Sequence, residues 1–78
     1  MPELFRAFGF SFFFFSREHE PIHIHVMGND GTAKYVWDGR MFILQEVHNI
    51  KLGDRRKIEA MIDENSDLII KRWEELFG

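Results

Sequence analysis

The 78-residue sequence contains no cysteine, which excludes disulfide bonds, thiolate zinc sites and cysteine nucleophiles. Its net charge is -3 with four histidines counted neutral, so it has no broad electrostatic attraction to nucleic acid or anionic lipid. The longest apolar run, residues 8–15, is interrupted by Gly9 and Ser11 and is shorter than the roughly 20 residues that cross a bilayer. The start does not read as a secretory signal. A cytoplasmic protein without a membrane segment is therefore expected.

Aromatic side chains are abundant instead. The chain has nine Phe and two Trp, and 45% of its residues are hydrophobic. A short chain buries a small fraction of its surface, and large rings offset this limit. We expect a single domain over residues 1–78 with a core made largely of these rings.

The first half of the chain alternates between apolar and polar residues, and Gly, Asn and Asp stand at the breaks. This pattern predicts an antiparallel meander. We expect three to four strands over about residues 4–15, 22–28, 32–37 and 40–45.

The second half has the apolar spacing of two amphipathic helices, over about residues 54–64 and 66–77. Asp54 is the expected N-cap of the first helix. The predicted fold class is α+β, with both helices packed on one face of the antiparallel sheet.

Three histidines, His19, His23 and His25, lie within seven residues of one another. Residues i and i+2 of a strand share a face. We therefore expect His23 and His25 to stand side by side on an outward face, with the aliphatic residues between them facing the core. Imidazole binds metals and transfers protons near neutral pH, so chemistry is expected here.

The first interpretation is a metal site. His23 and His25, joined by His19 or Glu20 from the preceding connection, supply ligands for a divalent metal such as zinc and leave an open position for water. Glu18 or Glu20 is then available as a base for hydrolysis. The structural alternative is that the strand histidines only cover an outer sheet face.

A second interpretation needs no metal. His23 and His25 act as general base and acid in phosphodiester cleavage, and Arg17 or Lys34 stabilises the phosphate charge. The acidic net charge counts against capture of a polyanion.

A third interpretation concerns the aromatic strand. Four successive Phe residues must point to both faces of a strand, and helices cover only one of them. Phe13 and Phe15 are therefore expected on a surface that binds a partner or a second copy.

The sequence resembles a known family at several points along nearly its whole length. The most specific part is the series His19, Pro21, His23, Ile24 and His25. Further matches are Met1-Pro2-Glu3, Arg6, Phe8-Gly9, Ser16, Glu18, Val26, Ala33-Lys34, Glu64-Asn65, Leu68 and Arg72-Trp73.

These residues resemble the small bacterial domain-of-unknown-function 4160 family (DUF4160). The chain has Ile22 where many members have a second Pro, and Ile24 where many have Phe. The resemblance implies no established activity. It implies a protein partner from the same operon, because members are often encoded beside another small protein in what has been proposed to be a toxin-antitoxin-like pair.

The sequence thus predicts a small intracellular interaction module of a toxin-antitoxin-like operon, with a histidine-lined sheet surface. Its binding residues would be Arg17, His19, Lys34, Phe13 and Phe15. The alternative is a nuclease or phosphodiesterase, metal-dependent or histidine-based, that uses His19, His23 and His25, with Glu20 assisting in catalysis. The sequence leaves open whether a metal, a homodimer or nucleic acid is involved.

Overall fold

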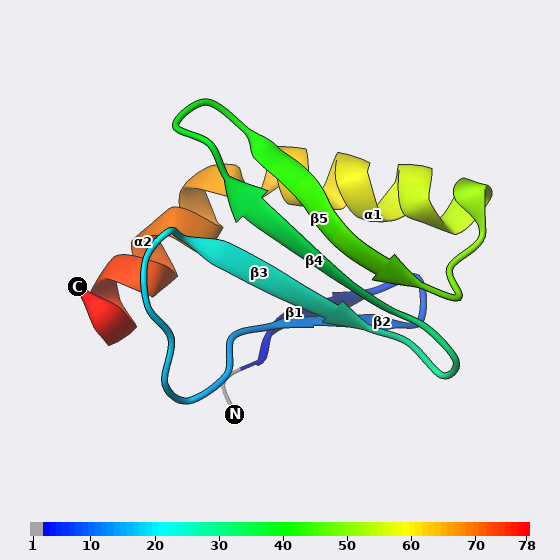
Figure 1. Cartoon of the computed structure of the whole chain (residues 1–78), viewed down its shortest axis with the longest axis horizontal. Coiled ribbons are helices and arrows are strands. Elements are labelled where there is room, and N and C mark those ends of the chain that lie inside the picture. Colours follow the sequence, from blue (N-terminus) through cyan, green and yellow to red (C-terminus); the bar gives the residue numbers. More distant parts are fainter. Residues whose placement is uncertain (1–2) are drawn as a thin grey trace.

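The computed structural model describes residues 3–78, which form five strands followed by two helices (Figure 1). The strands are β1 (Glu3–Ala7), β2 (Phe10–Phe13), β3 (His23–Met27), β4 (Thr32–Trp37) and β5 (Phe42–His48). They lie in one sheet in chain order, and every neighbouring pair is antiparallel. The helices, α1 (Leu52–Glu64) and α2 (Ser66–Phe77), cover one face of this sheet. The predicted α+β class is confirmed.

The segment expected as one strand over residues 4–15 contains two strands and the turn between them. Phe8 and Gly9 have φ values of 54° and 79°, and Ala7 pairs with Phe10 across the turn. Positive φ at both central residues is typical of a two-residue hairpin turn, but a bulky residue rarely adopts it. Phe8 therefore gave no turn signal and made the apolar run look continuous.

The core lies between the sheet and the helices. The most deeply buried side chains come from both layers and include Phe12, Phe14, Ile24, Tyr35, Ile58, Ile62 and Ile69. The β3–β4 turn depends on glycine, because a Cβ at Gly31 would lie 2.3 Å from the carbonyl oxygen of Asn49. The expected break between the strands predicted at 22–28 and 32–37 is confirmed.

The two helices match the predicted ones closely. α1 begins two residues earlier than expected, so its N-cap residue is Lys51 and Asp54 lies in the first turn. Asp54 is therefore not the cap, although a carboxylate in the first turn still complements the helix dipole. Among residues 3–78, neither helix is long and apolar enough to span a membrane.

Candidate metal centre

The aliphatic residues and the histidines of β3 alternate, so they project from opposite faces of the strand. Ile24 and Val26 are buried on the face that the helices cover, and His23 and His25 project together from the strand. Their ring centroids are 5.1 Å apart and the ring planes are nearly perpendicular. The expectation that the two rings stand side by side is confirmed, but His23 is only 7% exposed.

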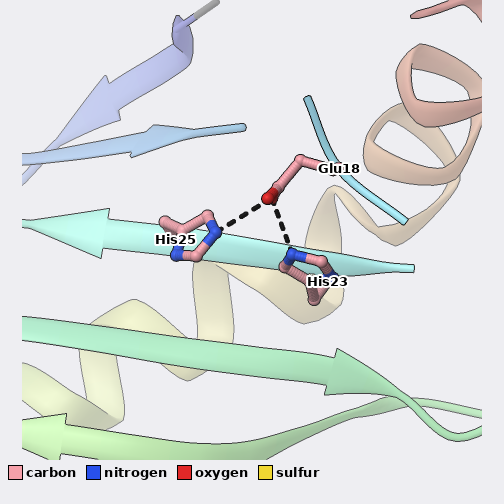
Figure 2. Close-up of side chains that lie close together, drawn as sticks. All are labelled: Glu18, His23 and His25. Carbon is pink, nitrogen blue, oxygen red and sulfur yellow. Dashed lines mark hydrogen bonds and ion pairs between the residues drawn. The ribbon is translucent and has the colours of Figure 1, made fainter. Parts of the chain in front are cut away.

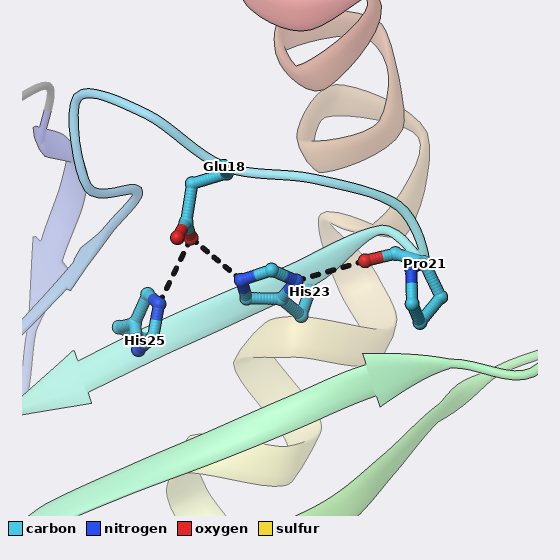
Figure 3. A network of polar contacts seen from close by, with 4 residues as sticks. All are labelled: Glu18, Pro21, His23 and His25. Atoms are coloured by element: carbon cyan, nitrogen blue, oxygen red, sulfur yellow. Dashed lines mark hydrogen bonds and ion pairs between the residues drawn. The ribbon is translucent and has the colours of Figure 1, made fainter.

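The connection between β2 and β3, residues 14–22, covers these two histidines. Its Glu18 side chain points toward both rings (Figure 2), and the loop itself passes over the start of β3 (Figure 3). Glu18 Oε2 lies 2.6 Å from His23 Nε2 and 2.9 Å from His25 Nε2. The side chains of Glu18, His23 and His25 are 9%, 10% and 15% exposed. We call these three residues the Glu18 cluster.

The other ring nitrogen of His23 is also fixed. Nδ1 lies 2.8 Å from the carbonyl oxygen of Pro21 (Figure 3). A carbonyl oxygen only accepts, so Nδ1 carries the hydrogen and donates it. In the neutral ring this leaves Nε2 with a lone pair that points at the Glu18 carboxylate.

His25 lies in an aromatic environment. Its ring stacks on Phe13 at 5.5 Å, and the ring of Phe15 is 4.3 Å away. Burial lowers the pKa of His25 below its ordinary value, although the hydrogen bond and charge of Glu18 act in the opposite direction. The neutral imidazole that a metal requires is therefore the favoured form of His25 at neutral pH.

The ring of Trp73, from α2, packs against His23 of the cluster. β2 pairs with β3 only as far as the Phe13–His25 pair, so the backbone beside His23 has no strand next to it on that side. The Trp73 ring lies 5.0 Å from the His23 ring at this position. The amphipathic spacing over residues 66–77 agrees with a buried Trp73, but nothing in the sequence indicated that it would contact His23.

The third member of the cluster differs from the expected one. His19, Glu20 and Arg17 are all exposed, and the metal-competent group contains Glu18 in place of His19. Neighbouring residues of a loop point in different directions, and their spacing from His23 in the sequence is nearly the same. Only the path of the loop decides which one faces the strand.

The remaining expected binding residues lie around His25. Lys34 of β4 is half-buried and pairs across the sheet with His25. Phe15 is 46% exposed, but Phe13 is only 2% exposed. Phe13 is thus not on an open surface as expected, because Phe15 and His25 pack against it.

The donor atoms of the Glu18 cluster fit a transition metal. Two imidazole nitrogens and one carboxylate oxygen lie within 4.8 Å of one another. Two histidines and one carboxylate occur in catalytic zinc sites and in non-haem iron sites, where further positions stay open for other ligands.

Comparison with known proteins gives a family match. A family model described as "Domain of unknown function (DUF4160)" matches residues 9–74, a range that includes the whole Glu18 cluster. No curated protein and no solved structure matches the chain.

Proposed function

This chain belongs to the DUF4160 family, whose description assigns no activity, and we propose that its function is to bind a divalent transition-metal ion, with zinc as the best fit, through Glu18, His23 and His25. The observation that carries the proposal is the contact between His23 Nε2 and Glu18 Oε2 at 2.6 Å, made while His23 Nδ1 donates to Pro21.

Two acceptor atoms that face each other at this distance need a cation between them. A proton or a metal ion satisfies the requirement. The hydrogen bond from Nδ1 to a backbone carbonyl supports the metal, because proteins orient metal-binding histidines in this way. The low exposure of all three side chains supports a preformed site.

The distances in the cluster are compatible with a bound ion after a small movement. Zinc holds nitrogen and oxygen ligands at about 2.0 Å, which places tetrahedral donors about 3.3 Å apart. The observed contacts of 2.6 and 2.9 Å are shorter, so binding requires Glu18 to move outward by less than about 1 Å. Glu18 is on a loop, where such a movement is easily accommodated.

The same geometry argues against metal-free acid and base catalysis. A general base needs a ring nitrogen that can reach the substrate. His23 directs one nitrogen to Pro21 and the other to Glu18, and His25 directs Nε2 to Glu18. Of these four ring nitrogens, only His25 Nδ1 lacks such a contact within residues 3–78, whereas a paired base and acid require one accessible nitrogen on each ring. The metal-dependent form of the expected hydrolase is thus better supported than the histidine-based form.

The predicted interaction module stays a prediction. Phe13 is buried, and the exposed apolar residues of the open sheet face, among them Phe15, Met27 and Ile43, stand among polar and charged neighbours. Scattered apolar residues are ordinary on a protein surface. Neither the family description nor the cluster supports the toxin-antitoxin role.

Calorimetric titration of the metal-free protein with zinc tests the proposal. We expect one zinc per chain, and we expect Glu18→Gln to weaken binding by at least about tenfold because the amide removes a charged ligand. Glu20→Gln is the matched control, since Glu20 is an exposed carboxylate of the same loop, and it should bind zinc as the wild type does.

A wild-type protein that takes up no zinc, cobalt or iron would show that the cluster is a buried ion pair held by a proton. Equal zinc affinity in Glu18→Gln would also contradict the proposal. Circular dichroism of each variant establishes that a loss of binding does not reflect a loss of fold.

A further inference from the structure

A hollow of about 300 Å³ lies on the open sheet face beside the Glu18 cluster. Its lining includes the rings of Phe15 and His25 and the charged or polar side chains of Lys34, Glu46 and His48. This volume is at the lower limit for small-molecule sites. It suits a ligand the size of a nucleotide.

His25 belongs both to this hollow and to the Glu18 cluster. Its ring lines the hollow, and its Nε2 faces Glu18. A ligand in the hollow therefore approaches the proposed metal ion past His25. An acidic group on such a ligand is the natural donor for an open metal position, because hard anionic oxygens bind divalent cations.

Lys34 places a positive charge beside His25. It pairs directly with His25 across β3 and β4. The ion pairs among residues 3–78 do not include Lys34, so its ammonium is available to an incoming anion. Lysine is a common phosphate-binding residue.

The other features of the hollow select the rest of the ligand. Glu46 pairs with Lys34 across β4 and β5, on the side of Lys34 away from His25. It repels an anion but accepts hydrogen bonds from hydroxyl or amino groups, which places the acidic group on the His25 side of Lys34. Phe15, 46% exposed, presents a ring on which a flat heterocycle can stack.

We infer that this hollow binds a small phosphate ester, of the nucleoside monophosphate class, with its phosphate between Lys34 and the metal ion of the Glu18 cluster. The inference rests on the proposed metal site. It adds the ligand class and the roles of Lys34, Glu46 and Phe15.

The test is calorimetric titration of zinc-loaded protein, freed of excess zinc, with adenosine 5′-monophosphate and with inorganic phosphate. We expect both to bind, the nucleotide more tightly. Lys34→Gln should weaken binding of both by about tenfold through loss of a charge-assisted contact, and Phe15→Ala should weaken binding of the nucleotide only.

The control variant is Lys71→Gln, because Lys71 is an exposed lysine of α2 outside the hollow. It should bind zinc, phosphate and nucleotide as the wild type does. Lys34→Gln should retain wild-type zinc affinity, which separates ligand binding from metal binding.

Zinc binding without detectable nucleotide or phosphate binding would overturn this inference and leave the proposed function intact. Equal nucleotide affinity in Lys34→Gln and wild type would also overturn it. A wild-type protein that binds no metal would overturn the proposed function and this inference together.

Discussion

The buried side chain of Tyr35 places a hydroxyl group within the hydrophobic core. Its side chain is 1% exposed, and its hydroxyl donates to Glu59 Oε2 at 2.8 Å. The same oxygen accepts a hydrogen bond from Arg55 Nε at 3.0 Å. Burial, assisted by the neighbouring carboxylate, raises the pKa of Tyr35 well above its ordinary value of 10.0.

This shift makes the fold sensitive to alkali. The unfolded chain loses the phenolic proton near pH 10, and the folded chain keeps it. The contribution of Tyr35 to stability is therefore complete below about pH 10 and falls as the pH rises above it. Because Tyr35 is the only tyrosine, tyrosinate absorbance reports on it alone, and it should rise together with the loss of circular dichroism.

Tyrosinate that forms near pH 10 in a protein with intact circular dichroism would contradict this prediction. Tyr35→Phe measures the hydroxyl separately. It removes a hydrogen bond to a charged group and should lower the free energy of unfolding by about 1–2 kcal/mol.

Within the elements, the β1–β2 turn contains a residue that is unfavourable for its backbone. Phe8 has φ 54° and is 56% exposed, and a left-handed conformation costs a bulky residue roughly 1 kcal/mol. The ammonium of Lys57 lies 5.6 Å from the Phe8 ring centroid, a contact that contributes about 0.5 kcal/mol at an exposed site.

The backbone cost is the larger of these two effects. Phe8→Asn should therefore raise the free energy of unfolding by about 0.5 kcal/mol, because Asn tolerates positive φ and Asn-Gly is favoured in such turns. Urea denaturation measures the difference. Lys57→Gln in the wild type tests the opposing contact, and it should lower stability slightly. A less stable Phe8→Asn protein would show that the ring contributes more than the strain removes.

Glu18 ties the middle of the loop over residues 14–22 to β3, while Phe14 is buried in the core near its start. Arg17 is exposed immediately before Glu18, so it is a potential trypsin site whenever the loop opens. Zinc should slow cleavage after Arg17 severalfold, because the ion ties Glu18 to β3. Mass spectrometry of timed digests measures this rate. Glu18→Gln should lose the protection, and unchanged cleavage at saturating zinc would contradict a bound loop.

Periodicity predicted the elements well wherever it extended over a whole element. Strands β3 to β5 and both helices lie within a few residues of their expected positions, since their alternating or helical spacing reflects one buried face. The β1–β2 turn was missed because Phe8 carries no turn signal. The position of Glu18 was missed because the direction of a loop side chain depends on contacts distant in sequence.

For the molecule as a whole, size limits stability. A chain of 78 residues buries a modest fraction of its surface, and folds of this size often depend on a metal or disulfide. The chain has no cysteine, so a metal at the Glu18 cluster is the available cross-link. It would connect the loop over residues 14–22 to the centre of the sheet.

Zinc should therefore raise the thermal stability of the whole domain. A ligand at 100 times its dissociation constant stabilises the native state by about 2.7 kcal/mol if it binds only that state. Differential scanning calorimetry with and without zinc measures the shift in melting temperature. Glu20→Gln should show the full shift and Glu18→Gln little of it. An equal shift in both would locate the zinc elsewhere.

The contact between Trp73 and His23 has a practical consequence. Because the two ring centroids are 5.0 Å apart, the indole is an intrinsic fluorophore whose emission reports on the Glu18 cluster. Cobalt or copper ions bound there should quench its emission, whereas zinc should not. In Trp37→Phe, which leaves Trp73 as the only indole, occupancy of the cluster becomes directly visible in a fluorimeter.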